Sequence, residues 1–430
     1  GPGDGPYLTE EGVRLELVSA EIAGSVARVT FRLTDAQGAP LDREGLLTEG
    51  RVETRFVLAR LEPSAGSPGV YAAYTTHEVT SPLTNQTAVQ PTNDTGGTYT
   101  LLDLDEGLYE YEMGVELSNV DGALTHTVGA WAYRDFEDRR YVDNEVLHFR
   151  PDGGATADPR DVVRTSDCNS CHNPLKAHGG LIREASLCVT CHTPGVIDPD
   201  TGNSVDFSVM IHKIHRGHDL PSVAAGGSYE IVASDGTKSY SDVAFPQPIQ
   251  NCESCHGGQH GPLWKEKPTA NACSSCHDDV SFAATPPPGM VAHGGGPQAN
   301  DNNCSVCHTA APSGLESITA NHWTQFTDPS APVVAANIVS VENGGPGQTP
   351  QMVFSVTVNG APRNIIAEPL TRLVVTVAGP TTDFATFWQH TIQGAGANPA
   401  LLTSDPLGFR YTFPAAMPAG SHALTLEDSW

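Results

Sequence analysis

The sequence predicts a multidomain protein in which two β domains flank a central domain of short helices and loops. Runs of alternating apolar and polar residues occur toward both ends of the 430-residue chain, and all ten cysteines lie between them. A chain of this length accommodates roughly two to four domains. The predicted domains cover residues 1–160, 161–325 and 326–430.

The first domain is predicted to be an antiparallel β-sandwich or barrel. Alternation over 26–33 puts the apolar side chains on one face, which is the pattern of a half-buried strand. The segments 51–58 and 108–117 alternate in the same way, and clusters of Gly, Pro, Asn and Asp separate the runs. Short strands divided by turn residues are typical of these all-β architectures.

The central domain is defined by its cysteines. Every cysteine belongs to a C-x-x-C pair, and every pair is followed at once by histidine. This is the attachment signature of a c-type haem, in which the thiols form thioethers and the histidine binds one axial face of the iron. The predicted attachment residues are Cys168, Cys171, Cys188, Cys191, Cys252, Cys255, Cys273, Cys276, Cys304 and Cys307. The predicted proximal ligands are His172, His192, His256, His277 and His308.

Other roles of paired cysteines explain this pattern less well. Zinc ribbons combine the pairs in twos and need no histidine after each pair. A thioredoxin-like motif is expected once, beside a βαβ pattern that this sequence lacks. A disulfide framework gives no reason for the five histidines. The sequence therefore predicts five covalently bound haem c groups, wrapped by short helices and loops.

Each iron also needs a ligand on its second axial face. Seven further histidines lie in the central domain, enough for two histidines at every iron with two to spare. His178 and His293 are followed by glycines, which let the backbone approach a porphyrin. His212 and His215 are three residues apart, so on a helix they share a face and can serve two neighbouring haems. His322 follows the last motif and suits the remaining iron.

The two spare histidines, His218 and His260, lie in polar loops beside glycine and are predicted to be exposed. The methionines of this region are Met210 and Met290. Methionine ligation at one iron is therefore an alternative that the sequence leaves open. The sequence does not assign a distal histidine to a particular iron, and it leaves the potentials and the order of the haems in space undetermined.

The third domain is predicted to be a second β domain. Apolar and polar residues alternate again over 353–358, 373–377 and 409–413, as expected of half-buried strands. A strand-like run continues to the last residue, so a partial β domain is one expectation for this region.

The net charge and the absence of apolar runs exclude several classes of partner and location. Asp and Glu number 50 against 23 Lys and Arg, for a formal net charge of −27. This charge argues against nucleic acid and anionic lipid as partners. The absence of an apolar run of about 18 residues excludes a membrane-spanning helix. Because haem c is attached outside the cytoplasm, we expect an exported protein whose signal peptide is absent from this chain.

The segment 165–325 resembles the first pentahaem module of the OmcA/MtrC family, the outer-membrane multihaem cytochromes of metal-reducing bacteria. The resemblance rests on CNSCH with KAHGG, on CVTCH with MIHKIHRGH, and on the motifs CESCH, CSSCH and CSVCH. It implies flanking split-barrel β domains and a position at the cell surface, on the outward face of the outer membrane. The distal ligands it implies are His178, His212, His215, His293 and His322.

The same resemblance implies partners and acceptors. Family members pass electrons to metal oxides, metal ions, flavins or partner cytochromes, and we expect contact with an outer-membrane porin–cytochrome complex. They commonly carry ten haems, whereas this chain has five motifs. The chain is therefore either the front portion of a longer protein or a shorter relative.

Electron conduction is the predicted activity, rather than catalysis. Two alternatives stay open: a reductase with one five-coordinate haem, and a filament in which one subunit supplies a distal histidine to the next. A weaker signal is the oxygen-rich stretch with Asp198, Asp200, Asn203 and Asp206, which could bind calcium. It does not follow the EF-hand pattern, and a turn is the simpler interpretation.

Overall fold

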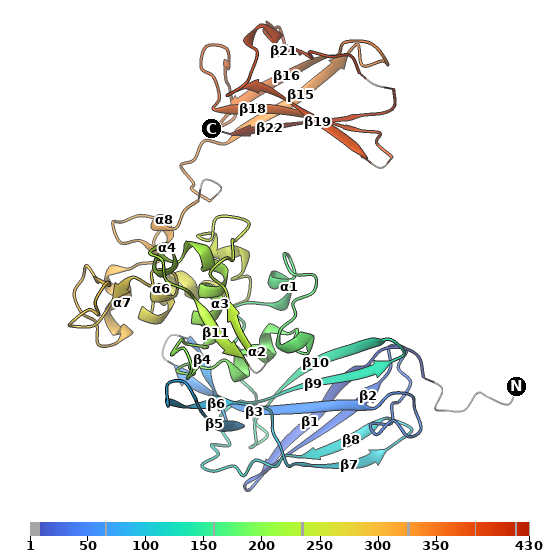
Figure 1. Ribbon diagram of the computed structural model, residues 1–430, viewed down its shortest axis with the longest axis vertical. Coiled ribbons are helices and arrows are strands. Elements are labelled where there is room, and N and C mark those ends of the chain that lie inside the picture. Colours follow the sequence, from blue (N-terminus) through green and yellow to red (C-terminus); the bar gives the residue numbers. More distant parts are fainter. Residues whose placement is uncertain are drawn as a thin grey trace, which may run out of the picture. The chain divides into compact units, whose positions relative to one another are not determined.

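The computed structural model describes residues 9–64, 67–157, 160–233, 236–324, 327–382, 384–417 and 419–429. The chain divides into two compact units, Gly1–Thr324 and Gln325–Trp430. The first unit holds both the first β region and the region of the cysteine motifs, and the second unit holds the last β region (Figure 1).

Two antiparallel sheets form the first β region. One sheet has the order β1 (Arg14–Ala23), β2 (Val26–Thr34), β8 (Leu108–Glu112), β7 (Thr98–Asp103). The other has the order β10 (Arg139–Phe149), β9 (His126–Phe136), β3 (Val52–Ser64), β4 (Ser67–Ala73). The strands β5 (Thr76–Thr80) and β6 (Thr87–Pro91) form a separate hairpin.

The core of this region lies between the two sheets, as the alternation predicted. Phe31 of β2 is fully buried, and its ring lies 5.2 Å from that of Phe56 on the opposite sheet. The predicted strand 108–117 ends early, at Glu112. The chain turns away there because the amides of Gly114 and Val115 donate to the carboxylate of Asp94.

The cysteine motifs lie in short helices joined by loops, as expected. The longest helix, α3 (Phe207–Arg216), has ten residues. The other helices are α1 (Thr165–Cys168), α2 (Ala185–Cys191), α4 (Pro221–Ala224), α5 (Leu263–Glu266), α6 (Ala270–Cys276), α7 (Cys304–Cys307) and α8 (Ile318–Asn321). The single turns are η1 (His178–Gly180), η2 (Gly217–Asp219), η3 (Cys252–Ser254) and η4 (Asp301–Asn303). The paired strands are β11 (Glu230–Ala233) with β12 (Gly236–Ser239), and β13 (Val280–Ser281) with β14 (Val291–Ala292).

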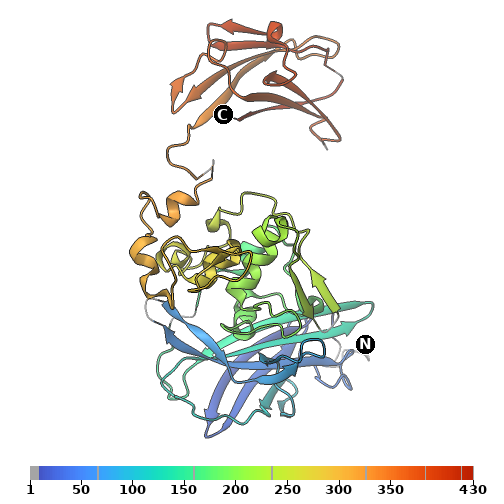
Figure 2. The ribbon, with the colours of Figure 1, turned by 60° about the vertical axis from the view of Figure 1, so that its left-hand side comes forward.

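This helical region packs on the outer face of the β10-β9-β3-β4 sheet, where α2 lies against the strands (Figure 2). Leu187 of α2 and Val57 of β3 are buried in one apolar cluster, which Trp131 of β9 covers in part. Gly129 of β9 makes this contact close, because a Cβ there would stand 2.4 Å from Leu187. The sheet therefore fixes the position of the second cysteine motif.

The second unit is another pair of antiparallel sheets around one core. One sheet has the order β15 (Val334–Glu342), β16 (Gln351–Val358), β21 (Gly408–Thr412), β20 (Leu402–Asp405), with β17 (Ala361–Pro362) beside β16. The other has the order β19 (Thr386–Gln393), β18 (Arg372–Gly379), β22 (Ala423–Ser429). The turn η5 (Pro399–Leu401) precedes β20. All three predicted strands of this region are present.

We expect Gly129→Ala to destabilise the first unit by about 1–3 kcal/mol, because the new methyl group overpacks the contact with Leu187. Urea unfolding of the whole chain measures the effect. Gly122→Ala is the matched control, since its Cβ would meet no described atom closer than 3.7 Å. Equal unfolding midpoints for the two variants would contradict this account of the sheet contact.

Candidate haem-binding site

All five C-x-x-C-H motifs adopt one tight turn. In each, the amide of the histidine donates to the carbonyl of the first cysteine, with N···O distances of 2.8–3.0 Å. One helical turn of this kind brings residues i, i+3 and i+4 to the same side. Both thiols and the imidazole of each motif therefore point toward a common space. All ten cysteines are free of disulfide bonds.

Each proximal histidine faces one of the predicted distal histidines across a short gap. The distances between ring centroids range from 5.8 to 6.3 Å. The pairs, in the order of the motifs, are His172 with His215, His192 with His178, His256 with His212, His277 with His322, and His308 with His293. The structure thus brings all ten predicted ligands together in five pairs.

The spacing fits a metal ion between the two rings. Two metal–imidazole bonds of about 2 Å each, added to the ring radii, place the centroids roughly 6 Å apart. Ring contact alone would favour particular interplanar angles. Here the angle varies from 13° to 76° while the distance stays nearly constant. A ring that rotates about a metal–nitrogen bond changes the interplanar angle but keeps its distance from the metal, which accounts for a varying angle at a nearly constant distance.

One imidazole in each pair is held by a backbone carbonyl. The bonded nitrogen is Nδ1 in every case, with Nδ1···O distances of 2.5–2.9 Å. A carbonyl can only accept, so Nδ1 carries the proton and Nε2 of the neutral ring keeps its lone pair for a metal. The residues are His192, His212, His215, His293 and His322.

Burial keeps several of these rings neutral. It lowers the pKa of His192, His212 and His277 below the ordinary value. Burial, together with the nearby His212, lowers the pKa of His256 to about 4. A metal binds only the unprotonated imidazole nitrogen, so these surroundings favour ligation at neutral pH.

Helix α3 supplies distal histidines to two different motifs. The carboxylate of Asp206 accepts from the amide of Ser208 and caps the N-terminus. One face, with the buried Val209, packs into the interior. His212 and His215 project from another face toward the third and the first motif. One helix therefore faces two motifs, as the sequence predicted.

A buried ion pair fixes α3 against the fourth motif. Lys213 Nζ lies 2.8 Å from the carboxylate of Asp278, which follows the proximal His277 directly. The amide and hydroxyl of Ser222 donate to the same carboxylate. Sequence reasoning missed these three residues, although the position of Asp278 beside a motif histidine was a signal that could have found it.

The remaining candidates lie outside the pairs. His218 is exposed and bonds Asp219, and His260 Nδ1 accepts from the amide of Asp161. Met210 packs in an apolar cluster. The calcium prediction gains no support: the carboxylate of Asp198 accepts from two amides and from the hydroxyl of Thr201. No cluster of three or more His, Cys, Asp or Glu side chains converges in the described residues.

The region from the third motif onward has no apolar core of its own. Between residues 236 and 324, all of which are described, no Val, Ile, Leu, Met, Phe, Trp or Tyr side chain is buried. A segment of this size cannot stay ordered without burying apolar surface. Porphyrin rings attached at its three motifs would provide that surface, so the residues of this segment fit bound haem groups.

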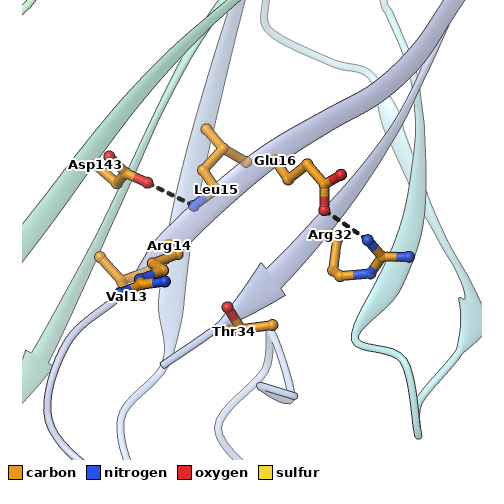
Figure 3. Close-up of a pocket in the computed structure, with 7 residues that line it drawn as sticks. All are labelled: Val13, Arg14, Leu15, Glu16, Arg32, Thr34 and Asp143. Carbon is orange, nitrogen blue, oxygen red and sulfur yellow. Dashed lines mark hydrogen bonds and ion pairs between the residues drawn. The ribbon is translucent and has the colours of Figure 1, made fainter. Parts of the chain in front are cut away.

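A surface pocket elsewhere shares none of these features. It is lined by Val13, Arg14, Leu15, Glu16, Arg32, Thr34 and Asp143 of the first β region (Figure 3). Its polar groups bind one another: the amide of Leu15 donates to Asp143, and Arg32 pairs with Glu16. None of the predicted haem ligands contributes to it.

Comparison with known proteins identifies the region of the motifs. Residues 160–323 match the family described as outer membrane cytochrome MtrC/MtrF-like, domains II/IV. The resemblance of this region to the OmcA/MtrC family of multihaem cytochromes is thereby confirmed. The matched range begins just before the first motif of this cytochrome and ends just after His322.

Individual relatives extend the likeness to the flanking regions. The multihaem cytochrome MtrC of Shewanella baltica is 26% identical over 304 residues, which cover 67% of this chain and 39% of the relative. The crystal structure of the outer membrane decahaem cytochrome OmcA superposes with a TM-score of 0.64 at 20% identity, covering 97% of this chain and 66% of OmcA. MtrC from Shewanella baltica superposes with a TM-score of 0.58 at 22% identity, covering 94% and 62%. The chain thus spans less than two thirds of each relative, and the solved structures share its fold.

None of the helices in the described part of the chain is long and apolar enough to cross a bilayer.

We expect His293→Ala to leave one haem without its sixth ligand, because His293 faces the proximal His308. The purified variant should show high-spin absorption and electron paramagnetic resonance signals for about one haem in five, whereas the native chain stays low-spin. His218→Ala is the control, since that ring is exposed and faces no motif histidine. High-spin signals in the control, or none in His293→Ala, would contradict the pairing.

The chain made without haem should have an uneven stability. We expect both β regions to protect their amides from hydrogen exchange, while residues 236–324 exchange rapidly because they bury no large apolar side chain. Replacing all ten cysteines by serine gives such a chain. Protection of 236–324 equal to that of β2 and β9 would show that the segment folds without haem.

Proposed function

We propose that this cytochrome is an electron carrier of the cell surface that holds five covalently attached haem c groups, each iron bound by two histidines. Bound haem supplies one-electron chemistry at its iron. The observation that carries the proposal is the set of five imidazole pairs, each of which joins a motif histidine to a histidine of the same chain.

The chain holds the five sites close together. The pKa of the Cys168 thiol is raised mainly by burial and secondly by the neighbouring Cys255. Burial followed by Cys168 raises the pKa of Cys188 to about 12. Thiols of different motifs therefore lie close enough for the charge of one to affect the other, which links the first motif to both the second and the third.

The same relation continues along the domain. The pKa of the Cys252 thiol is raised to about 11, mainly by burial and secondly by Cys276. Burial, and next Cys304, raises the pKa of Cys273. These neighbours support a series in the order second, first, third, fourth and fifth motif. Such a series would let an electron entering at one end leave at the other without a diffusing carrier.

The pairs favour a carrier over the two alternatives. A reductase needs one iron with an open position, but each of the five motif histidines faces a second imidazole. A filament that shares ligands needs a motif histidine whose partner comes from another subunit, and the five pairs form within one chain. A terminal reductase activity toward metals would then take place at an exposed haem edge rather than at an open iron.

The acceptors we propose are metal oxides, metal ions, flavins or partner cytochromes, with a porin–cytochrome complex as donor. The net charge of −27 attracts cations and basic surfaces. Two propionates on each haem would add to this negative charge. The chain is expected to act outside the cell or on the outer face of the outer membrane.

Removing a central haem tests both the number of haem groups and their order in the proposed series. Intact mass spectrometry should show five haem increments on the native chain and four on the double variant Cys252→Ala, Cys255→Ala. Loss of the third haem divides the proposed series in two, so oxidation by a soluble ferric chelate should become biphasic. Cys304→Ala with Cys307→Ala removes an end haem and should keep a single phase. Fewer than five increments on the native chain would refute the haem number, and a single phase in both variants would refute the order.

A further inference from the structure

The last residue of α3, Arg216, has a guanidinium group with an unused donor. Its Nε is fully buried and makes no hydrogen bond to any described residue. A buried donor without an acceptor is costly, and Arg216 forms no ion pair among the described residues, although the chain has 50 acidic residues for 23 basic ones. The described residues thus supply no acceptor for this donor.

The backbone holds Arg216 in place. Gly217 follows it with φ at +31°, and a Cβ on that glycine would stand 2.6 Å from the carbonyls of Tyr240 and Val243. The amide of His218 donates to the carbonyl of Val243. The backbone at the end of α3 is therefore packed closely against this loop.

The surroundings of Arg216 belong to the fourth motif. Helix α3 packs on α6, which ends at Cys276. The positive charge of Arg216 acts on His277, whose pKa is lowered first by burial and then by this arginine. The same charge acts on Cys276. Burial raises the pKa of this thiol, and Arg216 lowers it.

The carboxylate of Asp278, next to the fourth motif, is already occupied. Asp278 binds Lys213, which lies three residues before Arg216 and therefore on the same side of the helix. Ser222 binds the same carboxylate twice. Arg216 is left without a carboxylate partner among the described residues, close enough to the fourth motif for its charge to act on Cys276 and His277.

We propose that Arg216 binds a propionate of the haem attached at Cys273 and Cys276. A guanidinium forms two parallel hydrogen bonds with a carboxylate, which suits a planar fork better than an ammonium group. The inference rests on the proposed function, since it requires a haem at the fourth motif. Its consequence is that Arg216 raises the potential of this haem, because a nearby positive charge favours the reduced iron.

A spectroelectrochemical titration of Arg216→Gln tests the assignment. One of the five one-electron components should move to a lower potential, with the ratio of oxidised to reduced haem rising about tenfold at a fixed potential, or about 59 mV. Arg216→Lys keeps the charge and should recover most of that shift. Arg164→Gln is the matched control: it also removes one positive charge from the haem domain, but Arg164 is half-exposed and paired with Asp161.

The outcomes separate this inference from the proposed function. A native chain without haem increments in its mass would refute the proposed function itself. Five haems on Arg216→Gln with unchanged potentials and only a lower urea midpoint would mean that Arg216 has a structural role, and would overturn the inference. An equal shift in Arg164→Gln would also overturn it, since the effect would then be one of general charge.

Discussion

The arrangement of the region of the cysteine motifs depends on one constraint: two imidazoles from distant parts of the chain face each other about 6 Å apart at five places. The turn of each C-x-x-C-H motif fixes one ring locally, through a single bond from the histidine amide. The facing ring comes from up to 45 residues away, as His322 does for His277, so the loops must cross between motifs. Short helices and frequent glycines make such crossings sterically feasible.

Three structural devices position the members of these histidine pairs. The first sheet positions the second motif through the contact between Gly129 and Leu187. Helix α3 then positions the first and third motifs, and its ion pair from Lys213 to Asp278 connects it to the fourth. The fifth motif follows through η4 and α7, which have no buried apolar residues. Support from the polypeptide thus declines along the domain, and dependence on bound porphyrin rises.

The sequence was sufficient for the parts of the structure that repeat a local rule. Five C-x-x-C-H motifs define the thiols and the proximal rings, and alternation defined strands such as β2 and β16. The ranking of His178, His212, His215, His293 and His322 also agrees with the pairs. Which ring faces which motif could not be predicted, because it depends on contacts over long sequence separations. His322 follows the fifth motif yet faces the fourth, and the carboxylate of Asp198 accepts from an amide of its own turn.

The two ends of the proposed series have different surroundings. Cys188 and Cys191 of the second motif pack into the apolar cluster against the β10-β9-β3-β4 sheet, whereas Cys307 and Val306 of the fifth are exposed. Burial penalises whichever oxidation state carries the larger net charge, and exposure to water reduces that penalty. In the proposed series, the fold would therefore set the two ends at different potentials even with the same two ligands at every iron. In such a protein, the ligands make the haems alike, and the packing around them makes each haem distinct.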